Sequence, residues 1–133
     1  MSDTIAAIAT PTGEGGISII RCSGSGALAV AQKIFHTSTG NSVNELSSHR
    51  VHYGSIYDPK KNKYIDEVIL TWFKGPKSYT GEDVIEISAH GGGFVSSRIL
   101  GLVLDYGARP AEPGEFTRRA FMNGRIDLSQ AEA

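Results

Sequence analysis

The sequence has few of the features that would tie it to an oxidising compartment, a membrane or a nucleic-acid backbone. Its single cysteine, Cys22, cannot form an internal disulfide, so a reducing, cytoplasmic setting is expected. No basic-then-apolar leader opens the chain, and no apolar run approaches the roughly 20 residues that span a bilayer, so we expect no membrane association. A formal net charge of −1 gives no reason to expect the concentrated basic surface that binding to a phosphate backbone requires.

Motifs of several common chemistries are also missing. No second His or Cys stands at metal-ligand spacing from any of the histidines, so no metal site is expected. The G-x-x-x-x-G-K-[ST] phosphate loop does not occur, so we expect no GTP binding by this chain. Residues 90–93 (HGGG) are typical of the oxyanion loop of some esterases, but the G-x-S-x-G nucleophile elbow is absent. An independent small acyl-transfer or hydrolytic enzyme built around His90 stays open as an alternative function.

What the sequence does contain is one domain's worth of regular structure. The 133 residues, 40% apolar and 20% charged, are enough for a globular core. Period-two alternation and β-branched residues predict strands or extended segments over residues 4–10, 17–22, 51–57, 67–73, 83–88 and 108–113. Apolar residues at helical spacing predict helices over residues 27–35, 94–106 and 115–122. Residues 37–48 are expected to form a loop, and residues 127–130 (DLSQ) have the form of a capping box that opens a further helix, cut short at Ala133.

The stretch over residues 75–93 (GPKSYTGEDVIEISAHGGG) carries the strongest candidate site. It predicts a turn, a strand and a glycine corner at the start of a helix, where bare backbone N–H groups gather and can hold a ligand. The same glycines are equally compatible with a turn that only lets strand and helix pack closely. In the strand over residues 17–22, Arg21 shares a face with Ile17 and Ile19. Its guanidinium therefore either needs an anionic partner or reaches solvent at the strand end.

Three blocks of the sequence resemble the tRNA modification GTPases of the MnmE (TrmE) family. They are, in order, ATPTGEGGISIIRCSG, GPKSYTGEDVIEISAHGG and ARPAEPGEFTRRAFMNGRIDLSQAEA. They span almost the whole chain, and PGEFTRRAFMNGRIDLSQAEA is a highly specific signature. The resemblance covers the N-terminal tetrahydrofolate-binding and dimerisation domain, over residues 1–118, and the start of a truncated helical domain, over residues 119–133. The GTPase domain and the C-terminal reactive cysteine of the family lie beyond Ala133.

The resemblance implies an α+β fold, a mixed sheet with flanking helices similar to the tetrahydrofolate-binding domain of aminomethyltransferases. It implies a homodimeric enzyme that hydrolyses GTP and acts with the flavoprotein MnmG (GidA). Together they install a carboxymethylaminomethyl group at C5 of the wobble uridine, position 34, of certain tRNAs. A tetrahydrofolate derivative, 5-formyl- or 5,10-methylene-tetrahydrofolate, is the implied cofactor and supplies the one-carbon unit. GTP, potassium and magnesium are implied only for the absent GTPase domain.

Three folate contacts carry over from the family by position: Arg21 in IIRCSG, Glu86 in DVIEIS and Arg125 in NGRIDLS. Arg125 is a departure, because well-known members have lysine there, and a planar guanidinium binds differently from an ammonium. A reduced pterin presents a ring N–H beside an exocyclic amine, and the carboxylate of Glu86 can accept both. The anionic folate tail suits Arg21 or Arg125. Further candidates to line the binding pocket are His90, Gly91 and Gly92.

Two alternatives concern the same strands. Without the resemblance, Glu86 would be a solvated residue on the polar face of its strand, beside Val84 and Ser88. Self-association is expected from the resemblance, and an apolar sheet edge at residues 67–73 (EVILTWF) could supply the contact.

Overall fold

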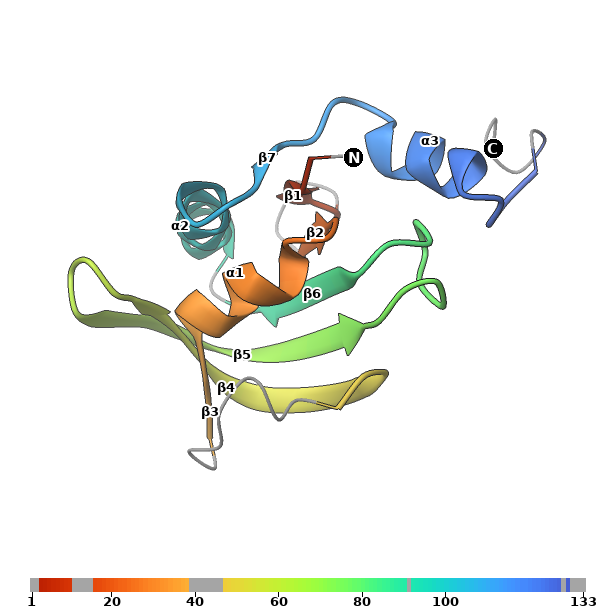
Figure 1. Ribbon diagram of the computed structural model, residues 1–133. Coiled ribbons are helices and arrows are strands. Elements are labelled where there is room, and N and C mark those ends of the chain that lie inside the picture. The colour runs from red at the N-terminus through yellow and green to blue at the C-terminus, as the bar shows by residue number, and fades with distance from the viewer. Residues whose placement is uncertain (1–2, 11–15, 39–46, 91, 128, 130–133) are drawn as a thin grey trace.

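The computed structural model describes residues 3–10, 16–38, 47–90, 92–127 and 129. In these ranges seven strands form one sheet in the order β3-β4-β5-β6-β2-β1-β7, with three helices around it (Figure 1). All neighbouring strands are antiparallel except β1 and β7, which are parallel, so the predicted α+β fold with a mixed sheet is confirmed. The elements are β1 (Ile5–Ile8), β2 (Ser18–Ser23), α1 (Ala27–Ile34), β3 (Phe35–Thr37), β4 (Arg50–Asp58), β5 (Lys63–Phe73), β6 (Val84–Ala89), α2 (Gly92–Asp105), β7 (Arg109–Pro110) and α3 (Glu115–Met122).

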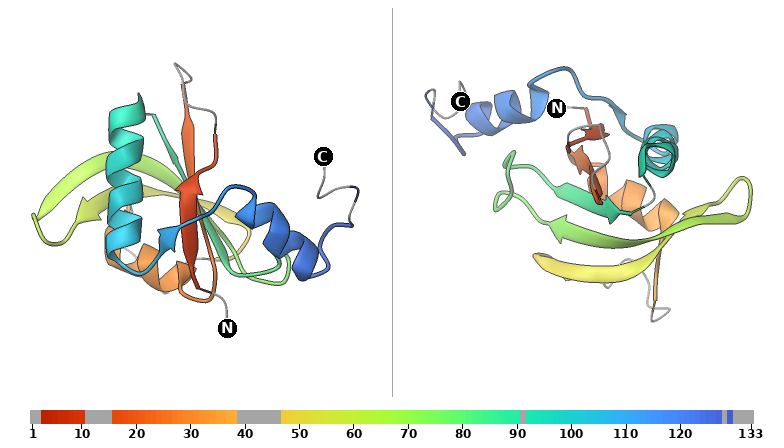
Figure 2. Two further views of the ribbon diagram at one scale, coloured as in Figure 1. Left: turned by 90° about the horizontal axis from the view of Figure 1, so that it is seen from above. Right: turned by 180° about the vertical axis from the view of Figure 1, so that it is seen from behind.

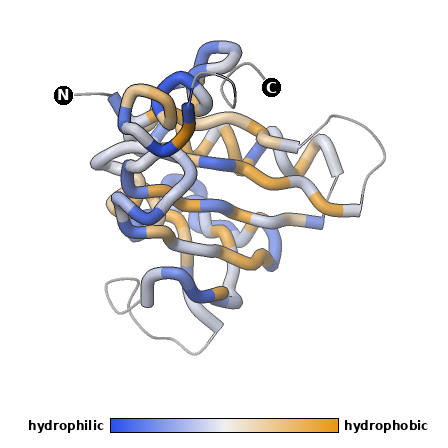
Figure 3. The backbone as a smooth tube through the Cα atoms, turned by 90° about the vertical axis from the view of Figure 1, so that its right-hand side faces the viewer, coloured by the Kyte–Doolittle hydropathy of each residue, from blue (hydrophilic) through white to orange (hydrophobic). Residues whose placement is uncertain are grey.

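Helices α1 and α2 close one face of the sheet and also contact each other (Figure 2). Every second side chain of the strands points to this face, because side chains alternate along a strand. Ile20, Ile87 and Leu70 lie opposite one another on β2, β6 and β5 and are at most 1% exposed. Apolar stretches follow the strands in Figure 3. This face therefore holds the hydrophobic core, in which each large side chain contributes about 1.5–3 kcal/mol through burial.

The opposite face of the sheet is covered only in part. Helix α3 and the segment over residues 74–83 lie at one end of it, and α2 and α3 lie on either side of β1 and β2 (Figure 2). At the covered end Ser23 and Val84 are buried. Further along, the strands place two cross-strand rows on this open face: Ala7, Arg21, Glu86, Thr71 and Val51 in one, and Ile19, Ser88, Ile69 and Tyr53 in the other.

Most predicted elements are present with shifted ends. β5 begins at Lys63, earlier than the predicted residue 67, because its first residues pair with the end of β4. Phe35 leaves α1 with extended backbone, is fully buried and pairs with Ile56, so a short strand β3 follows the helix directly. The predicted loop over residues 37–48 is therefore wrong at Thr37, where burial of Phe35 extends the sheet. Residues 39–46 of that loop lie outside the described residues.

The apolar edge predicted at residues 67–73 is wrong. These residues belong to β5, which pairs with β4 on one side and with β6 on the other. Their backbone N–H and C=O groups are thus already used inside the sheet and cannot pair with a second chain. Among the described strands the two at the edges are β3 and β7.

The C-terminal part of the chain continues directly from the sheet. Helix α3 (Glu115–Met122) runs across the domain boundary predicted between residues 118 and 119, and that boundary stays a prediction. The helix expected to open at residues 127–130 lies in part outside the described residues, since Leu128 and Gln130 are not among them. None of the described helices is long and apolar enough to cross a membrane.

Candidate ligand-binding site

Arg21 and Glu86 lie directly opposite each other on β2 and β6, in the middle of the sheet. Arg21 Nε donates a hydrogen bond to Glu86 Oε2 over 2.8 Å. Both side chains belong to the open face and are about a quarter exposed, at 24% and 23%. The structure thus brings together two residues that the sequence analysis named separately. It also gives Arg21 the anionic partner that a guanidinium in a largely apolar strand needs.

Two aromatic rings flank the guanidinium of Arg21. Its Cζ lies 5.2 Å from the ring centroid of Tyr79 and 5.5 Å from that of Phe116, within the range of cation–π attraction. The Tyr79 hydroxyl is 2.8 Å from Thr117 Oγ1, which ties the ring to helix α3. Tyr79 and Phe116 were not predicted from the sequence, because neither belongs to a motif or to a hydrophobic pattern that indicates a binding site. Their only signal was their place within the family-specific blocks.

The Arg21–Glu86 pair keeps hydrogen-bonding capacity. Within the described part of the chain, the terminal nitrogens Nη1 and Nη2 of Arg21 and the oxygen Oε1 of Glu86 make no hydrogen bond. Because a guanidinium has five N–H donors and a carboxylate about four lone-pair positions, one mutual bond leaves most of both free. The pair has no net charge. It can therefore bind a ligand that offers an acceptor and donors side by side.

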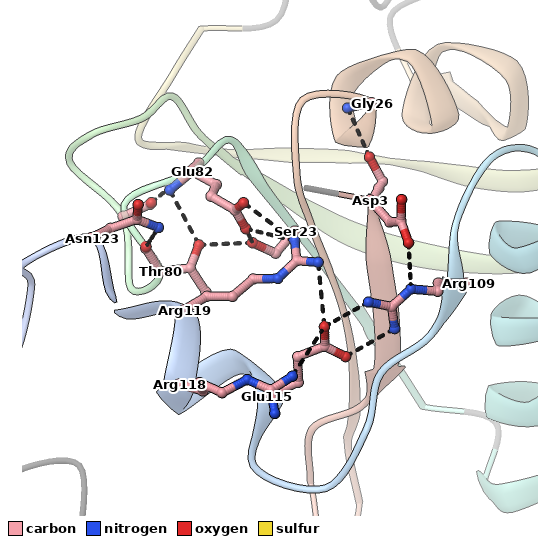
Figure 4. A network of polar contacts seen from close by, with 12 residues as sticks. Asp3, Ser23, Gly26, Thr80, Glu82, Arg109, Glu115, Arg118, Arg119 and Asn123 are labelled. Carbon is pink, nitrogen blue, oxygen red and sulfur yellow. Dashed lines mark hydrogen bonds and ion pairs between the residues drawn. The ribbon is translucent and has the colours of Figure 1, made fainter. Parts of the chain in front are cut away.

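The walls of the site come from a turn over residues 78–82 that is bonded to α3 and the residues after it. Arg125 Nε donates to the Ser78 carbonyl over 2.9 Å, and Asn123 Nδ2 donates to the Thr80 carbonyl over 2.8 Å. Arg119 Nη1 lies 3.1 and 3.2 Å from the two carboxylate oxygens of Glu82 (Figure 4). These contacts hold the 78–82 turn and α3 together, so Tyr79 and Phe116 keep their places beside Arg21.

Arg125, the third predicted folate contact, lies next to this turn and not on the sheet. Its hydrogen-bond acceptor, Ser78, is the residue directly before Tyr79, and Tyr79 in turn lies beside Arg21. No described carboxylate pairs with Arg125, so its positive charge is not compensated within the described part of the chain.

An ionic cluster around the buried carboxylate of Glu115 anchors the start of α3 (Figure 4). Arg109 Nη1 and Nη2 donate to the two carboxylate oxygens of Glu115 over 2.9 and 2.7 Å, and Arg119 Nη2 donates to Glu115 over 3.3 Å. The hydrogen bonds from Arg109 and from the Glu112 backbone lower the pKa of Glu115 to about 2, against the effect of burial. The side chain of Glu115 is 3% exposed. This cluster fixes the position of α3 and is already satisfied by its own members.

The glycine corner lies away from the Arg21–Glu86 pair. His90 is exposed and follows the far end of β6, about 13 Å from Glu86 at roughly 3.3 Å per strand residue. Gly92 begins α2 with φ of +76°, and a side chain there would meet nothing within 4 Å, so its backbone angle is what requires glycine. Gly91 lies outside the described residues. No described side chain hydrogen-bonds His90, so the acyl-transfer alternative gains no support from a nucleophile–base pair.

Neither the cysteine nor the metal-ligating side chains form a reactive site in the described part of the chain. Cys22 is 1% exposed, and burial raises the pKa of its thiol to about 12, so it is not a nucleophile. No group of three or more His, Cys, Asp or Glu side chains among the described residues is arranged to hold a metal ion.

A sheet closed by helices on one face, with a part-exposed ion pair beside two aromatic rings on the other, defines a small α+β module. Its family follows from comparison with known proteins. The family described as "GTP-binding protein TrmE N-terminus" matches residues 4–125, and the chain belongs to that family. The resemblance seen in the three sequence blocks is thereby confirmed.

Curated relatives agree with this assignment. The chain is 58% identical over 131 residues to a protein of Lysinibacillus sphaericus and 56% identical over 133 residues to one of Moorella thermoacetica. Both relatives are named tRNA modification GTPase MnmE. The alignments cover 98% and 100% of this chain but only 28% and 29% of the relatives. The chain thus spans less than a third of the length of the curated relatives it matches.

Proposed function

We propose that this chain is the tetrahydrofolate-binding, dimerising N-terminal part of a GTP-hydrolysing enzyme. The enzyme installs the carboxymethylaminomethyl group at C5 of the wobble uridine, position 34, of certain tRNAs. Support comes from the family and from relatives that are named tRNA modification GTPases. Because the chain spans less than a third of their length and matches the N-terminal family, we assign GTP hydrolysis with its potassium and magnesium to segments outside this chain.

The Arg21–Glu86 pair is the observation that carries the folate proposal. A reduced pterin ring offers an oxygen acceptor, a ring N–H and an exocyclic amine, and the pair offers free guanidinium donors beside a carboxylate with unused lone pairs. The rings of Tyr79 and Phe116 supply the aromatic surroundings that ligand sites commonly have. These residues fit the ring of 5-formyl- or 5,10-methylene-tetrahydrofolate, which when bound supplies the one-carbon unit.

Arg125 fits the anionic tail of the same cofactor. It carries an uncompensated charge within the described part of the chain and lies beside the turn that holds Tyr79. Lysine, which well-known members have at this position, provides the same positive charge without the planar guanidinium. A flexible glutamate tail is attracted mainly by that charge and depends less on the fixed donor geometry of a guanidinium.

We assign the contact surface of the homodimer to the open face of the sheet, because β5 is an internal strand and cannot pair with a second chain. Val51 and Tyr53 are 56% and 66% exposed there, and Ile69 lies directly opposite Tyr53 on the neighbouring strand β5. Exposed apolar side chains gathered on one face mark contact surfaces more often than scattered ones do. A second copy on this face would also enclose the neighbouring row that carries Arg21 and Glu86.

The partners and setting follow from the same assignment. The flavoprotein MnmG (GidA) is the proposed partner of the intact enzyme, tRNA is the substrate of the complex, and the cytoplasm is the setting. None of these requires a contact from the glycine corner at His90.

Two measurements test the proposal. Calorimetric titration of this chain with 5-formyltetrahydrofolate should give saturable binding, whereas folic acid lacking the reduced ring should bind more weakly. For the enzymatic part, the full-length protein should restore modified wobble uridine in tRNA of a bacterium that lacks its own copy, as read by nucleoside mass spectrometry. Absence of folate binding would refute the proposed cofactor, and unmodified wobble uridine would refute the proposed enzymatic function.

A further inference from the structure

We infer that the hairpin joining β4 and β5, together with the aromatic rings at its base, is a contact surface for unpaired RNA. The lysines at the tip of the hairpin bind phosphates, and a hollow beside the rings takes a base. Only the source of that RNA, a loop of the tRNA substrate, rests on the proposed function. The surface lies apart from the Arg21–Glu86 pair and needs no folate.

The tip of the hairpin is a local concentration of positive charge. It projects from the rest of the sheet (Figure 1), and Lys60, Lys61 and Lys63 are exposed there. None of the three pairs with a carboxylate of the described residues. The one carboxylate of the turn, Asp58, is buried and accepts from the backbone N–H groups of Lys60 and Lys61 over 3.0 and 3.3 Å. The net charge of −1 for the whole chain thus conceals a tip whose ammonium groups are available to phosphates.

Three aromatic rings lie at the base of the hairpin. His36 on β3 stacks on Tyr57 with ring centroids 4.7 Å apart, and the ring of Tyr64 lies 5.8 Å from His36 and 5.1 Å from Tyr57. The Tyr57 hydroxyl donates to the side chain of Asn62, which ties the rings to the turn. His36 and Tyr64 are exposed, Tyr64 to 66%. Exposed rings of this kind are platforms on which unpaired bases stack.

A hollow of about 510 Å³ opens beside the rings, within the size range of small-ligand sites. It is lined by His36 and Tyr64 and by the acidic residues Asp66 and Glu67, among others. The Oδ2 atom of Asp66 is buried without a hydrogen-bond partner in the described part of the chain. Glu67 is exposed and makes no hydrogen bond or ion pair with any described residue. Carboxylates accept hydrogen bonds from the amines of a base but repel a phosphate, so the hollow suits a base.

A basic tip next to an acidic, aromatic hollow favours a single-stranded nucleic acid over other anions. Its phosphates suit the lysines, and its unpaired bases suit the rings and the carboxylates. An anionic membrane or a polyanion without bases would use the lysines alone. Tyr57 is four residues along β4 from Tyr53, about 13 Å at roughly 3.3 Å per residue, so the rings lie beyond the row proposed for the dimer contact.

Fluorescence anisotropy tests the charged tip. The probes are a short RNA stem-loop with an unpaired loop, like the anticodon arm of a tRNA, and a blunt RNA duplex of the same length. This chain should bind the stem-loop more tightly than the duplex. Lys60→Gln/Lys61→Gln should weaken stem-loop binding several-fold and reduce the slope of log K against log salt by about 1.4, since each phosphate contact to a single strand contributes about 0.7. The matched control Lys74→Gln/Lys77→Gln removes the same charge beyond the opposite end of β5 and should change neither quantity.

Tyr64→Ala tests stacking separately from charge. It should weaken stem-loop binding about tenfold, because stacking of a base on an aromatic side chain is lost. Binding of heparin, a polyanion without bases, should not change. Tyr64→Phe keeps the ring and should bind the stem-loop nearly as well as the wild type. Because Tyr64→Phe and the lysine variants leave the packing of the sheet intact, the test does not depend on the folding of Tyr64→Ala.

Several results would overturn the inference. One is an equal loss of affinity in the Lys74→Gln/Lys77→Gln control, which would show a dependence on overall charge and not on the hairpin. Others are an equal effect of Tyr64→Ala on heparin and on RNA, and a wild-type chain that binds phosphatidylserine vesicles but not the stem-loop in low salt. The proposed function is tested by folate titration and by modification of the wobble uridine, so its failure is distinct from a failure of RNA contact at this hairpin.

Discussion

Replacing Glu86 by glutamine tests the centre of the site with almost no change of side-chain volume. In the protein, Glu86 Oε2 accepts from Arg21 Nε over 2.8 Å, and the side chain is 23% exposed. Glutamine keeps one acceptor and turns the other oxygen into an NH₂ group, which faces a donor wherever a pterin N–H or amine approaches. The variant therefore removes charge-assisted hydrogen bonds and adds a donor–donor contact.

The expected losses differ in size for binding and for stability. For binding, losing the charged acceptor in a partly dry site should cost roughly 2–4 kcal/mol, or about thirty- to several hundred-fold in folate affinity. For stability, the pair with Arg21 is partly solvated, so the free energy of unfolding should fall by only about 0.5–1 kcal/mol. A variant that loses most of its ligand affinity should thus still unfold cooperatively, within a few degrees of the wild-type midpoint.

The assay is calorimetric titration with 5-formyltetrahydrofolate alongside a thermal unfolding curve for each protein. Glu67→Gln is the matched control, because Glu67 is an exposed carboxylate on the neighbouring strand β5, two residues before Ile69 of the open face. It should leave both folate affinity and stability unchanged. Wild-type affinity in a folded Glu86→Gln protein would refute the reasoning and leave Glu86 a partner of Arg21 only.

Three further predictions concern other parts of the molecule. Hydrogen bonds lower the pKa of Glu115 to about 2 from its ordinary 4.5, so its stabilising effect should be complete above about pH 4.5 and disappear towards pH 2. Glu115→Gln should lower the free energy of unfolding at pH 7 by roughly 3 kcal/mol and remove most of the change in urea midpoint between pH 4.5 and pH 2. A variant whose urea midpoint depends on pH as in the wild type would contradict this. Cys22 should react with a thiol reagent only after unfolding, and equal labelling of native and urea-unfolded protein would show that its burial is wrong. Tyr53→Asp should shift sedimentation from dimer to monomer, whereas the control Phe94→Asp, at a 76% exposed position on α2, should leave the dimer intact. If both variants sediment as dimers, the open face is not the dimer contact.

Much of the architecture could be predicted from the sequence because it depends on local pattern. The alternation in β6 and the apolar stripe of α2 follow from side-chain periodicity, and both elements are present within two residues of the predicted bounds. The family could be recognised for a similar reason, since its signature is a run of residues in order along the chain. The predicted folate contacts came from that signature as well, and Arg21, Glu86 and Arg125 remain proposals as ligand residues.

What could not be predicted depends on which strands lie side by side. The apolar residues of β5 read equally well as an edge or as an internal strand, because pattern reports burial of a face and not the identity of the neighbouring strand. Phe35 looked helical by spacing, but its pairing with Ile56 overrode that preference once the residue was buried in the sheet.

The site itself was decided by tertiary structure. Arg21 and Glu86 are 65 residues apart in the chain and meet because β2 and β6 pair in one particular register, in which a slip by one residue would turn one of them to the core. Tyr79 and Phe116 reach the same guanidinium only after the 78–82 turn and α3 have docked through Glu82 and Arg119. The sequence by itself determined which chemical groups are available and on which face of each strand they lie. Only long-range packing, which minimises buried unpaired charge across the whole sheet, determined which of those groups face one another.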